Sequence, residues 1–267
     1  MKLNFMEITG QGPAIIIVHG WGQSRSSMAP LADALASGHR VINIDLPGHG
    51  AARDLPGPYT FSRYMDWISQ MAKEYTDGQF HLLGWSMGGA IAARYALERL
   101  APIPSSLVLL AAPARFIAPK GSGLGQTLSA IERLRAQLTA DHTAALRTFI
   151  EFFFMSGELI GPEMEAPIRA ALTPAGAFPP DKEALLATLG ELTELDLTRH
   201  RAIPSFVRGL IINGTLDRIC PVAGQALWDG IFSDLSWSTM DNCGHAPHLT
   251  RLADTAAAIN NFLSGSY

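Results

Sequence analysis

The sequence predicts an α/β fold, with a mostly parallel sheet flanked by helices and a helical segment inserted into it. Three observations predict this class. Short apolar runs alternate with helical stretches before residue 112 and again after residue 209. Runs such as residues 15–18 are continuously apolar, as strands covered on both faces require. Between the two alternating parts, residues 113–204 show helical spacing of apolar side chains and no strand pattern.

Seven apolar runs are expected to form the strands, near residues 3–8, 14–19, 41–45, 80–85, 106–112, 209–213 and 235–240. Five stretches are expected to form the flanking helices, near residues 26–36, 60–75, 87–99, 222–231 and 252–264. In a sheet of this kind, functional side chains gather at the carboxyl ends of the parallel strands.

The interruption of the pattern predicts the domain organisation. Residues 1–112 and 205–267 are expected to form one core, and residues 113–204 a helical cap over its functional edge. Two apolar stripes indicate helices within the cap. The first comprises Leu128, Ile131, Leu134 and Leu138, and the second comprises Leu146, Phe149, Ile150, Phe153 and Phe154. We expect the second stripe to roof an apolar cleft.

The composition narrows the function. The chain has 267 residues, of which 48% are hydrophobic and 16% charged, which is enough for a large core. A net charge of −4 and a pI near 6.0 give no reason to expect nucleic-acid binding. No signal-like segment opens the chain, and no apolar run approaches the ~18–20 residues that span a bilayer. We therefore expect a soluble, cytoplasmic monomer without membrane contact. Cys220 and Cys243 are expected to be free thiols beside the site, with a disulfide between them as the alternative.

The most informative motif is Gly84-Trp85-Ser86-Met87-Gly88, which follows an expected strand and precedes an expected helix. Glycines on both sides of a serine allow a turn tight enough to hold that serine in a strained conformation above the strand end. A serine hydroxyl is a poor nucleophile unless a base takes its proton. The motif therefore predicts a nucleophilic Ser86, and this role requires a histidine and an acid elsewhere in the chain.

Asp217 and His245 are the best-placed partners for Ser86. Asp217 follows the expected strand at 209–213, and His245 lies in a loop after Gly244 and before the last expected helix. An aspartate in this role holds the imidazole in one tautomer and stabilises its charge. The sequence thus predicts a Ser-His-Asp triad.

Other residues compete for the acid and base roles. Asp45 lies before the nucleophile in the chain, and we expect it to brace a loop instead. Asp196 follows a helical stretch, and Asp241 lies too close to His245 to approach its ring from a separate loop. His248 competes with His245 as the base but lacks a preceding glycine.

Two backbone N–H groups are candidates for an oxyanion hole. Trp21 belongs to His19-Gly20-Trp21-Gly22, directly after an expected strand, and Met87 follows the nucleophile. Two donors aimed at one point stabilise the charge that develops on a carbonyl oxygen. This chemistry needs no cofactor, and no spacing of histidines and cysteines predicts a metal site.

These motifs resemble the α/β-hydrolase superfamily, in which nucleophile, acid and base follow one another in the chain order found here. The resemblance covers the whole chain and is carried by residues 18–22, 45–50, 83–89, 216–221 and 244–247. Trp21, Trp85, the His-Ala-Pro run at 245–247 and the length and position of the cap resemble the BioH-type pimeloyl-[acyl-carrier protein] methyl ester carboxylesterases of biotin synthesis. The resemblance implies an α/β-hydrolase fold with the cap inserted after the sixth strand.

The resemblance also implies roles for individual residues. Ser86 would be the nucleophile, Asp217 the acid and His245 the base, with oxyanion donors from Trp21 and Met87. The cleft would be lined by Trp21, Trp85, Phe149, Phe152 and Phe153. The reaction would convert the methyl ester of pimeloyl-[acyl-carrier protein] to pimeloyl-[acyl-carrier protein] and methanol.

The family docks acyl carrier protein through cap arginines, and the counterparts here are Arg133, Arg135 and Arg147. The alternative interpretation of these arginines is an ordinary solvated helix face. Two other functions remain open for the chain. One is a broad-specificity small-ester or lactone hydrolase of the same fold, and the other is an inactive α/β-hydrolase that only binds. Dehalogenases and epoxide hydrolases are disfavoured, because those relatives carry an aspartate where Ser86 stands.

Overall fold

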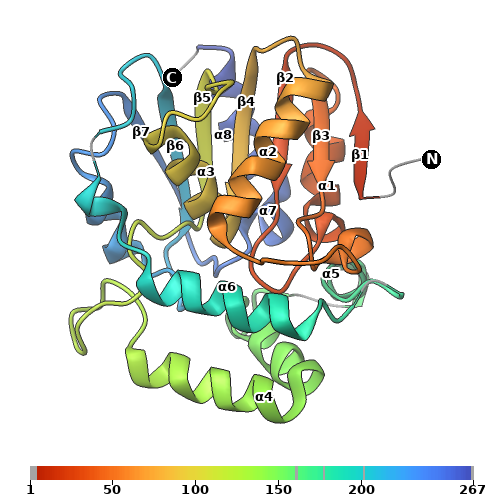
Figure 1. The fold of residues 1–267 in the computed structure, drawn as a ribbon, viewed down its shortest axis with the longest axis vertical. Coiled ribbons are helices and arrows are strands. Elements are labelled where there is room, and N and C mark those ends of the chain that lie inside the picture. Colours follow the sequence, from red (N-terminus) through yellow and green to blue (C-terminus); the bar gives the residue numbers. More distant parts are fainter. Residues whose placement is uncertain (1–4, 160–161, 177, 201, 266–267) are drawn as a thin grey trace.

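The computed structural model describes residues 5–159, 162–176, 178–200 and 202–265. Within these residues, seven strands form one sheet in the order β1-β3-β2-β4-β5-β6-β7 (Figure 1). The strands are β1 (Met6–Thr9), β2 (Ala14–Val18), β3 (Arg40–Ile44), β4 (Phe80–Trp85), β5 (Ser106–Leu110), β6 (Arg208–Gly214) and β7 (Leu235–Met240). β1 runs antiparallel to β3, and the other neighbouring strands pair in parallel. The predicted sheet is confirmed, although residues 3 and 4 of the first expected strand lie outside the described residues.

Helices cover both faces of the sheet, as the apolar strands require. α1 (Arg25–Leu35) and α8 (Leu252–Leu263) contact each other on one face, and α2 (Phe61–Tyr75) and α3 (Met87–Leu97) contact each other on the opposite face (Figure 1). Every residue of β2 and β5 is buried between these layers. The short elements are η1 (Gly50–Ala52), η3 (Val222–Trp228) and α7 (Pro247–Thr250). The helix expected near 222–231 is therefore only a short 3-10 segment, with Pro221 and Gly224 at its start.

The residues between β5 and β6, which we call the inserted segment, contain α4 (Leu128–Glu151), α5 (Pro162–Leu172), α6 (Lys182–Glu194) and η2 (Leu197–Arg199). α4 packs against α6, and both lie across the end of the sheet at which the parallel strands finish (Figure 1). The segment covers the edge at which functional side chains were expected. The boundaries 113–204 for a separate cap unit stay a prediction.

Two expectations about the inserted segment are wrong in detail. The segment follows β5, the fifth described strand, rather than a sixth strand. Among the described residues, β1 alone precedes β2, and it pairs with β3 at the edge of the sheet. The second apolar stripe is not one helix face, because α4 ends at Glu151 and Phe153 and Phe154 lie beyond it. α4 is also kinked at Asp141, where φ is −149° and ψ is 96°.

Candidate active site

Ser86 occupies the sharp turn between β4 and α3. Its φ of 53° and ψ of −116° lie in a region that residues with a side chain rarely adopt, so the turn holds the serine in a strained conformation. Both flanking glycines are required by close backbone approach. A Cβ on Gly84 would lie 2.3 Å from the carbonyl of Gly88, and a Cβ on Gly88 would lie 2.4 Å from the carbonyl oxygen of Val18. The sequence motif thus encodes the turn that its spacing predicts.

Asp217 and His245 form a buried pair beside this turn. Nδ1 of His245 donates to Oδ2 of Asp217 at 2.8 Å, because an ionised carboxylate can only accept. Oδ1 of Asp217 accepts from the backbone N–H groups of Ile219 at 2.8 Å and Cys220 at 2.9 Å. The carboxylate is therefore fixed by its own loop, and the imidazole is held in the tautomer that leaves Nε2 without a proton.

The residue before Ser86, Trp85, contacts the pair formed by Asp217 and His245. The indole of Trp85 donates to the backbone oxygen of His245 at 2.9 Å, and the two rings lie 5.6 Å apart. Burial raises the pKa of the Cys220 thiol, as does the charge of Asp217, whereas a hydrogen bond with Ser86 opposes the rise. Trp85, the residue before Ser86, thus contacts the residue that pairs with Asp217.

The competing acids and base are engaged elsewhere. Asp45 accepts from the backbone N–H of Arg25 and Ala51 and pairs with the guanidinium of Arg25 at 2.8 Å, so it braces its loop as expected. Asp196 pairs with Arg199 at 3.0 Å, and Asp241 is exposed. His248 packs on Trp85 with ring centroids 4.5 Å apart, and burial lowers its pKa to about 3. Of these side chains, His245 is the one that Asp217 contacts.

Trp21 and Met87 lie where oxyanion donors are expected. Met87 is the first residue of α3, so its N–H belongs to the helix end that attracts negative charge. Trp21 is buried in the loop after β2, and its indole donates to the backbone oxygen of Leu185 on α6 at 3.2 Å. His19 supports this loop: its Nε2 accepts from Leu46 N–H at 3.1 Å, and burial lowers its pKa to about 4. The oxyanion role of Trp21 and Met87 stays a prediction.

The phenylalanines expected over the site divide into two groups. Phe149 lies edge-on to Trp21 with centroids 5.1 Å apart and, with Phe152, lines a cavity of about 340 Å³. Phe153 is buried and packs on His245 at 5.5 Å and on Trp85 at 5.2 Å. Phe149 and Phe152 therefore line this cavity, and their contact with a substrate stays a prediction. Phe153 and Trp85 lie against the ring of His245, and their direct substrate contact stays a prediction.

The 340 Å³ cavity is mainly apolar and carries two arginines but no acid among its described lining residues. One is Arg133, and the other is Arg218, which the sequence did not indicate although it directly follows Asp217. The guanidinium of Arg218 lies 5.5 Å from the ring centroid of Phe152 and donates to the backbone oxygen of Phe154 at 3.0 Å. Ile219, also in this loop, lines the cavity, and its N–H donates to Asp217.

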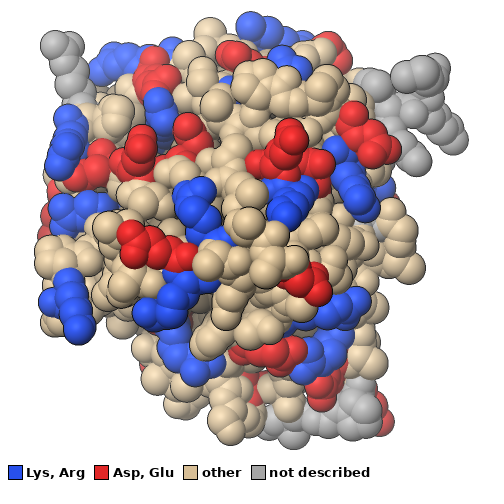
Figure 2. All heavy atoms as spheres, turned by 60° about the horizontal axis from the view of Figure 1, so that its bottom comes forward, with Lys and Arg blue, Asp and Glu red and all other residues tan. Residues whose placement is uncertain are grey.

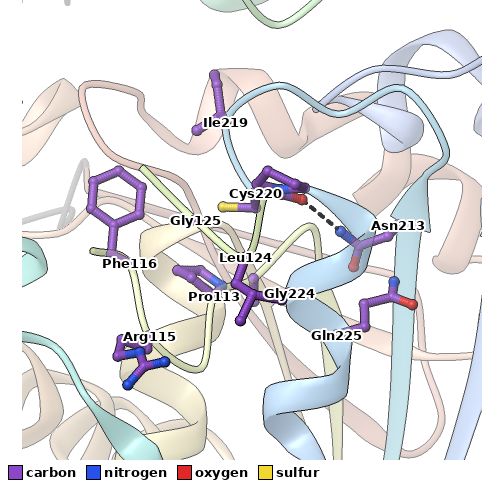
Figure 3. Close-up of a pocket in the computed structure, with 12 residues that line it drawn as sticks. Pro113, Arg115, Phe116, Leu124, Gly125, Asn213, Ile219, Cys220, Gly224 and Gln225 are labelled. Carbon is purple, nitrogen blue, oxygen red and sulfur yellow. Dashed lines mark hydrogen bonds between the residues drawn. The ribbon is translucent and has the colours of Figure 1, made fainter. Parts of the chain in front are cut away.

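The loop that carries Asp217 is held by hydrogen bonds from the core and from the inserted segment. Figure 3 shows a second, water-sized cavity of about 10 Å³, into which the sulfur of Cys220 points, with Asn213 donating to the backbone oxygen of Cys220 at 3.2 Å. Gln126 of the inserted segment donates to the backbone oxygens of Arg218 and Ile219, each at 2.8 Å. Cys220 and Cys243 are both free thiols, as expected.

The three arginines expected to dock a partner do not gather in one place. Arg133 lines the cavity, whereas Arg135 reaches the backbone oxygen of Leu186 at 3.5 Å and Arg147 lies 5.3 Å from the ring centroid of Phe178. Figure 2 turns the lower end of the molecule in Figure 1, where the inserted segment lies, toward the viewer, and basic and acidic side chains are mixed on this face rather than gathered in one basic patch. In the portion of the chain described, no group of three potential metal ligands occurs, and no helix has the length and hydropathy needed to cross a membrane.

The fold and this geometry define a class of protein, and comparison with known families agrees. The model of the alpha/beta hydrolase family matches residues 15–258, so the chain belongs to that family. A pimeloyl-[acyl-carrier protein] methyl ester esterase of Methylococcus capsulatus is 32% identical over 267 residues, with 98% of this chain and 99% of that protein covered. The protein of the same name from Aeromonas hydrophila is 28% identical over 258 residues, with 97% and 98% covered.

Solved structures show the same fold. An esterase from Exiguobacterium antarcticum superposes with a TM-score of 0.84 at 22% identity, covering 97% of this chain and 94% of that one. An enol-lactonase from Burkholderia xenovorans gives a TM-score of 0.81 at 20% identity, covering 97% and 95%. The sequence relatives support a hydrolase of the esterase type.

Proposed function

We propose that this chain is a serine carboxylesterase that hydrolyses the methyl ester of pimeloyl-[acyl-carrier protein], releasing pimeloyl-[acyl-carrier protein] and methanol for biotin synthesis. The observation that carries the proposal is the buried His245–Asp217 pair at 2.8 Å beside the strained turn of Ser86. Full-length relatives that bear the name of this esterase support the choice of substrate.

The mechanism follows from these positions. Nε2 of His245 takes the proton of Ser86 as the serine oxygen attacks the ester carbonyl. Asp217 stabilises the imidazolium, and the N–H groups of Trp21 and Met87 bind the oxyanion of the tetrahedral intermediate. His245 then gives its proton to the leaving methoxide, which departs as methanol. Water repeats the sequence on the acyl-enzyme, releases the acid and restores Ser86.

The 340 Å³ cavity suits the acyl part of such a substrate. Its wall contains Ile131, Leu134, Phe149 and Phe152, which offer apolar contact to methylene groups. Arg133 and Arg218 give the wall positive charge, which favours an acidic carrier protein or an anionic group on the substrate. A carrier-bound chain would therefore meet apolar and basic groups in the same cavity.

A second candidate is a broad-specificity ester or lactone hydrolase. The observation that favours it is the dispersal of Arg133, Arg135 and Arg147, because a carrier protein would bind better to a continuous basic patch.

The deciding experiment compares carrier-bound methyl pimeloyl ester with p-nitrophenyl acetate, using wild-type protein and Ser86→Ala. We expect wild-type protein to hydrolyse both and to restore biotin-free growth to a strain lacking this esterase. Ser86→Ala should remain folded and lose roughly 10⁴-fold or more in turnover, together with labelling by a fluorophosphonate. Hydrolysis of the acetate alone would favour the broad esterase. Hydrolysis of neither substrate would leave the binding protein as the better interpretation.

A further inference from the structure

A buried carboxylate of the inserted segment lies against the loop of the proposed base. Glu158 is 5% exposed and follows α4 by a few residues. Its Oε2 accepts from the backbone N–H of Met155 at 2.8 Å, and its Oε1 accepts from the hydroxyl of Thr250 at 2.6 Å. Both oxygens accept from the backbone N–H of Gly244 at 3.0 Å. None of the steps described above uses this carboxylate.

The contact falls on the residue directly before His245. A second hydrogen bond joins the loop of the proposed base to the inserted segment: the N–H of His245 donates to the backbone oxygen of Phe153 at 2.8 Å. Two consecutive N–H groups of the base loop are thus held by residues of the inserted segment. From the core side, the indole of Trp85 holds the backbone oxygen of His245 at 2.9 Å.

Gly244 makes this approach sterically possible. A Cβ at this position would lie 2.3 Å from the backbone oxygen of Phe153 and 2.9 Å from Oε2 of Glu158. The glycine before the base therefore serves close packing against the inserted segment. A buried carboxylate is tolerated only when hydrogen bonds replace its lost water, and bonds to a charged acceptor are stronger than neutral ones. Glu158 meets that requirement by binding the loop of the base.

We propose that Glu158 is a positioning residue for the general base: its carboxylate fixes Gly244, and through Gly244 the place of the His245 imidazole relative to Ser86. The proposal rests on the proposed function, in which His245 takes the serine proton. Transfer of a proton is sensitive to geometry, and displacing a reacting group by about 1 Å can reduce the rate about 10²-fold.

Two variants at this position separate hydrogen bonding from charge. Glu158→Ala removes every bond to the loop, and we expect kcat for p-nitrophenyl acetate to fall roughly 10- to 100-fold while KM changes less than about twofold. Glu158→Gln should retain most of the activity. Its amide oxygen can accept from Gly244 and Met155, and its NH₂ group can donate to the hydroxyl of Thr250.

Glu191→Ala provides a matched control. Glu191 is also a carboxylate of the inserted segment and accepts from a core backbone N–H, that of Phe61 at 3.1 Å, but it does not touch the base loop. We expect this variant to lower the melting temperature and to leave kcat near the wild-type value. The proposal would be overturned if kcat fell in Glu191→Ala as well as in Glu158→Ala, by amounts that follow the decrease in melting temperature of each variant. Glu158 would then act only on stability.

Amide hydrogen exchange tests the positioning without relying on catalysis. Exchange at Gly244 and His245 should be faster in Glu158→Ala than in wild-type protein, and nearly unchanged in Glu158→Gln and Glu191→Ala. Unchanged exchange in Glu158→Ala would contradict the proposal even if activity falls. Inactivity of the wild-type protein on every ester would contradict the proposed function, and the exchange result would still decide whether Glu158 fixes the loop. If Glu158→Ala does not fold, Glu158→Asp gives the same comparison, because its shorter side chain withdraws the carboxylate from Gly244.

Discussion

At the scale of single residues, the candidate site depends on hydrogen bonds that each allow one orientation. Asp217 shows this most clearly, because one of its oxygens is occupied by the N–H groups of Ile219 and Cys220 and the other by His245. The two N–H groups leave the carboxylate no freedom to rotate. The proton on Nδ1 of His245 is therefore dictated by the loop after β6.

Asp217→Asn should be severely impaired for this reason. The amide oxygen would stay on the N–H groups of Ile219 and Cys220, and the NH₂ group would face Nδ1 of His245 and impose the other tautomer. We expect kcat to fall by about 10⁴-fold with folding preserved, as measured with p-nitrophenyl acetate. Asp196→Asn and Asp241→Asn are the controls and should remain active. Near-normal activity of Asp217→Asn together with loss in either control would show that another acid serves His245.

At the scale of elements, the end of α4 separates aromatic side chains with different tasks. Phe149 lies within the helix and reaches the cavity, whereas Phe153 lies beyond the helix end and packs on His245. Residues four apart in the sequence thus contact the cavity and the proposed base respectively.

Shortening these two side chains should have different kinetic consequences. Phe149→Ala removes apolar contact worth about 1–3 kcal/mol, so activity on medium-chain esters should fall ten- to hundredfold more than activity on acetate esters. Phe153→Ala should reduce activity on all chain lengths alike, because it loosens the packing around the imidazole. kcat/KM for p-nitrophenyl esters of increasing chain length measures both effects. Parallel losses in Phe149→Ala would exclude the cavity as the acyl site.

The elements also show what a sequence can predict. The sheet and the turn at Ser86 were predictable, because apolar runs and Gly84, Ser86 and Gly88 act over short stretches of chain. The kink at Asp141 and the helix end at Glu151 were missed, since apolar spacing continues past both positions. The contact between Glu158 and Gly244 joins residues 86 positions apart, and no local pattern records such a contact. Arg218 carried a usable signal, namely a charge directly beside the predicted acid.

At the scale of the whole molecule, charge on the inserted segment bears on carrier binding. Arg133 lines the cavity, whereas Arg135 and Arg147 on the same helix reach other surfaces. Arg133→Glu should slow hydrolysis of the carrier-bound ester about three- to tenfold at low salt, with little effect on p-nitrophenyl acetate. Arg135→Glu and Arg147→Glu are matched controls from α4 and should change either rate less. Equal effects of all three substitutions, or none at any salt concentration, would argue against docking at the cavity.

Buried histidines make the whole fold sensitive to acid. Burial lowers the pKa of His19 and His81 to about 4 and of His49 and His248 to about 3. Their pKa in the unfolded chain is about 6.5, so between pH 6.5 and about 4 they bind protons only when the protein unfolds. Their contribution to stability is therefore fully present above about pH 7 and is lost as the pH falls, by up to about 5 kcal/mol per pH unit for four protons.

Urea unfolding at pH 7, 6 and 5 measures this slope. His248→Gln should reduce the slope by about one quarter, because one of the four protons is no longer taken up. An unchanged slope in that variant would mean that His248 does not contribute to acid sensitivity, whatever its effect on stability at pH 7.

The bonds from Phe153 and Glu158 to the base loop have a consequence for protein engineering. The inserted segment is an attractive unit for exchange between homologues, because it lies between β5 and β6 while Ser86, Asp217 and His245 lie in the core. The inserted segment and the core cannot be separated cleanly at the ends of β5 and β6, because residues 153–158 hold the base loop of the core. A chimera in which the whole inserted segment is replaced by that of a homologue should fold but have a low kcat. One that keeps this short stretch beside Gly244 should acquire the donor's selectivity with its speed intact.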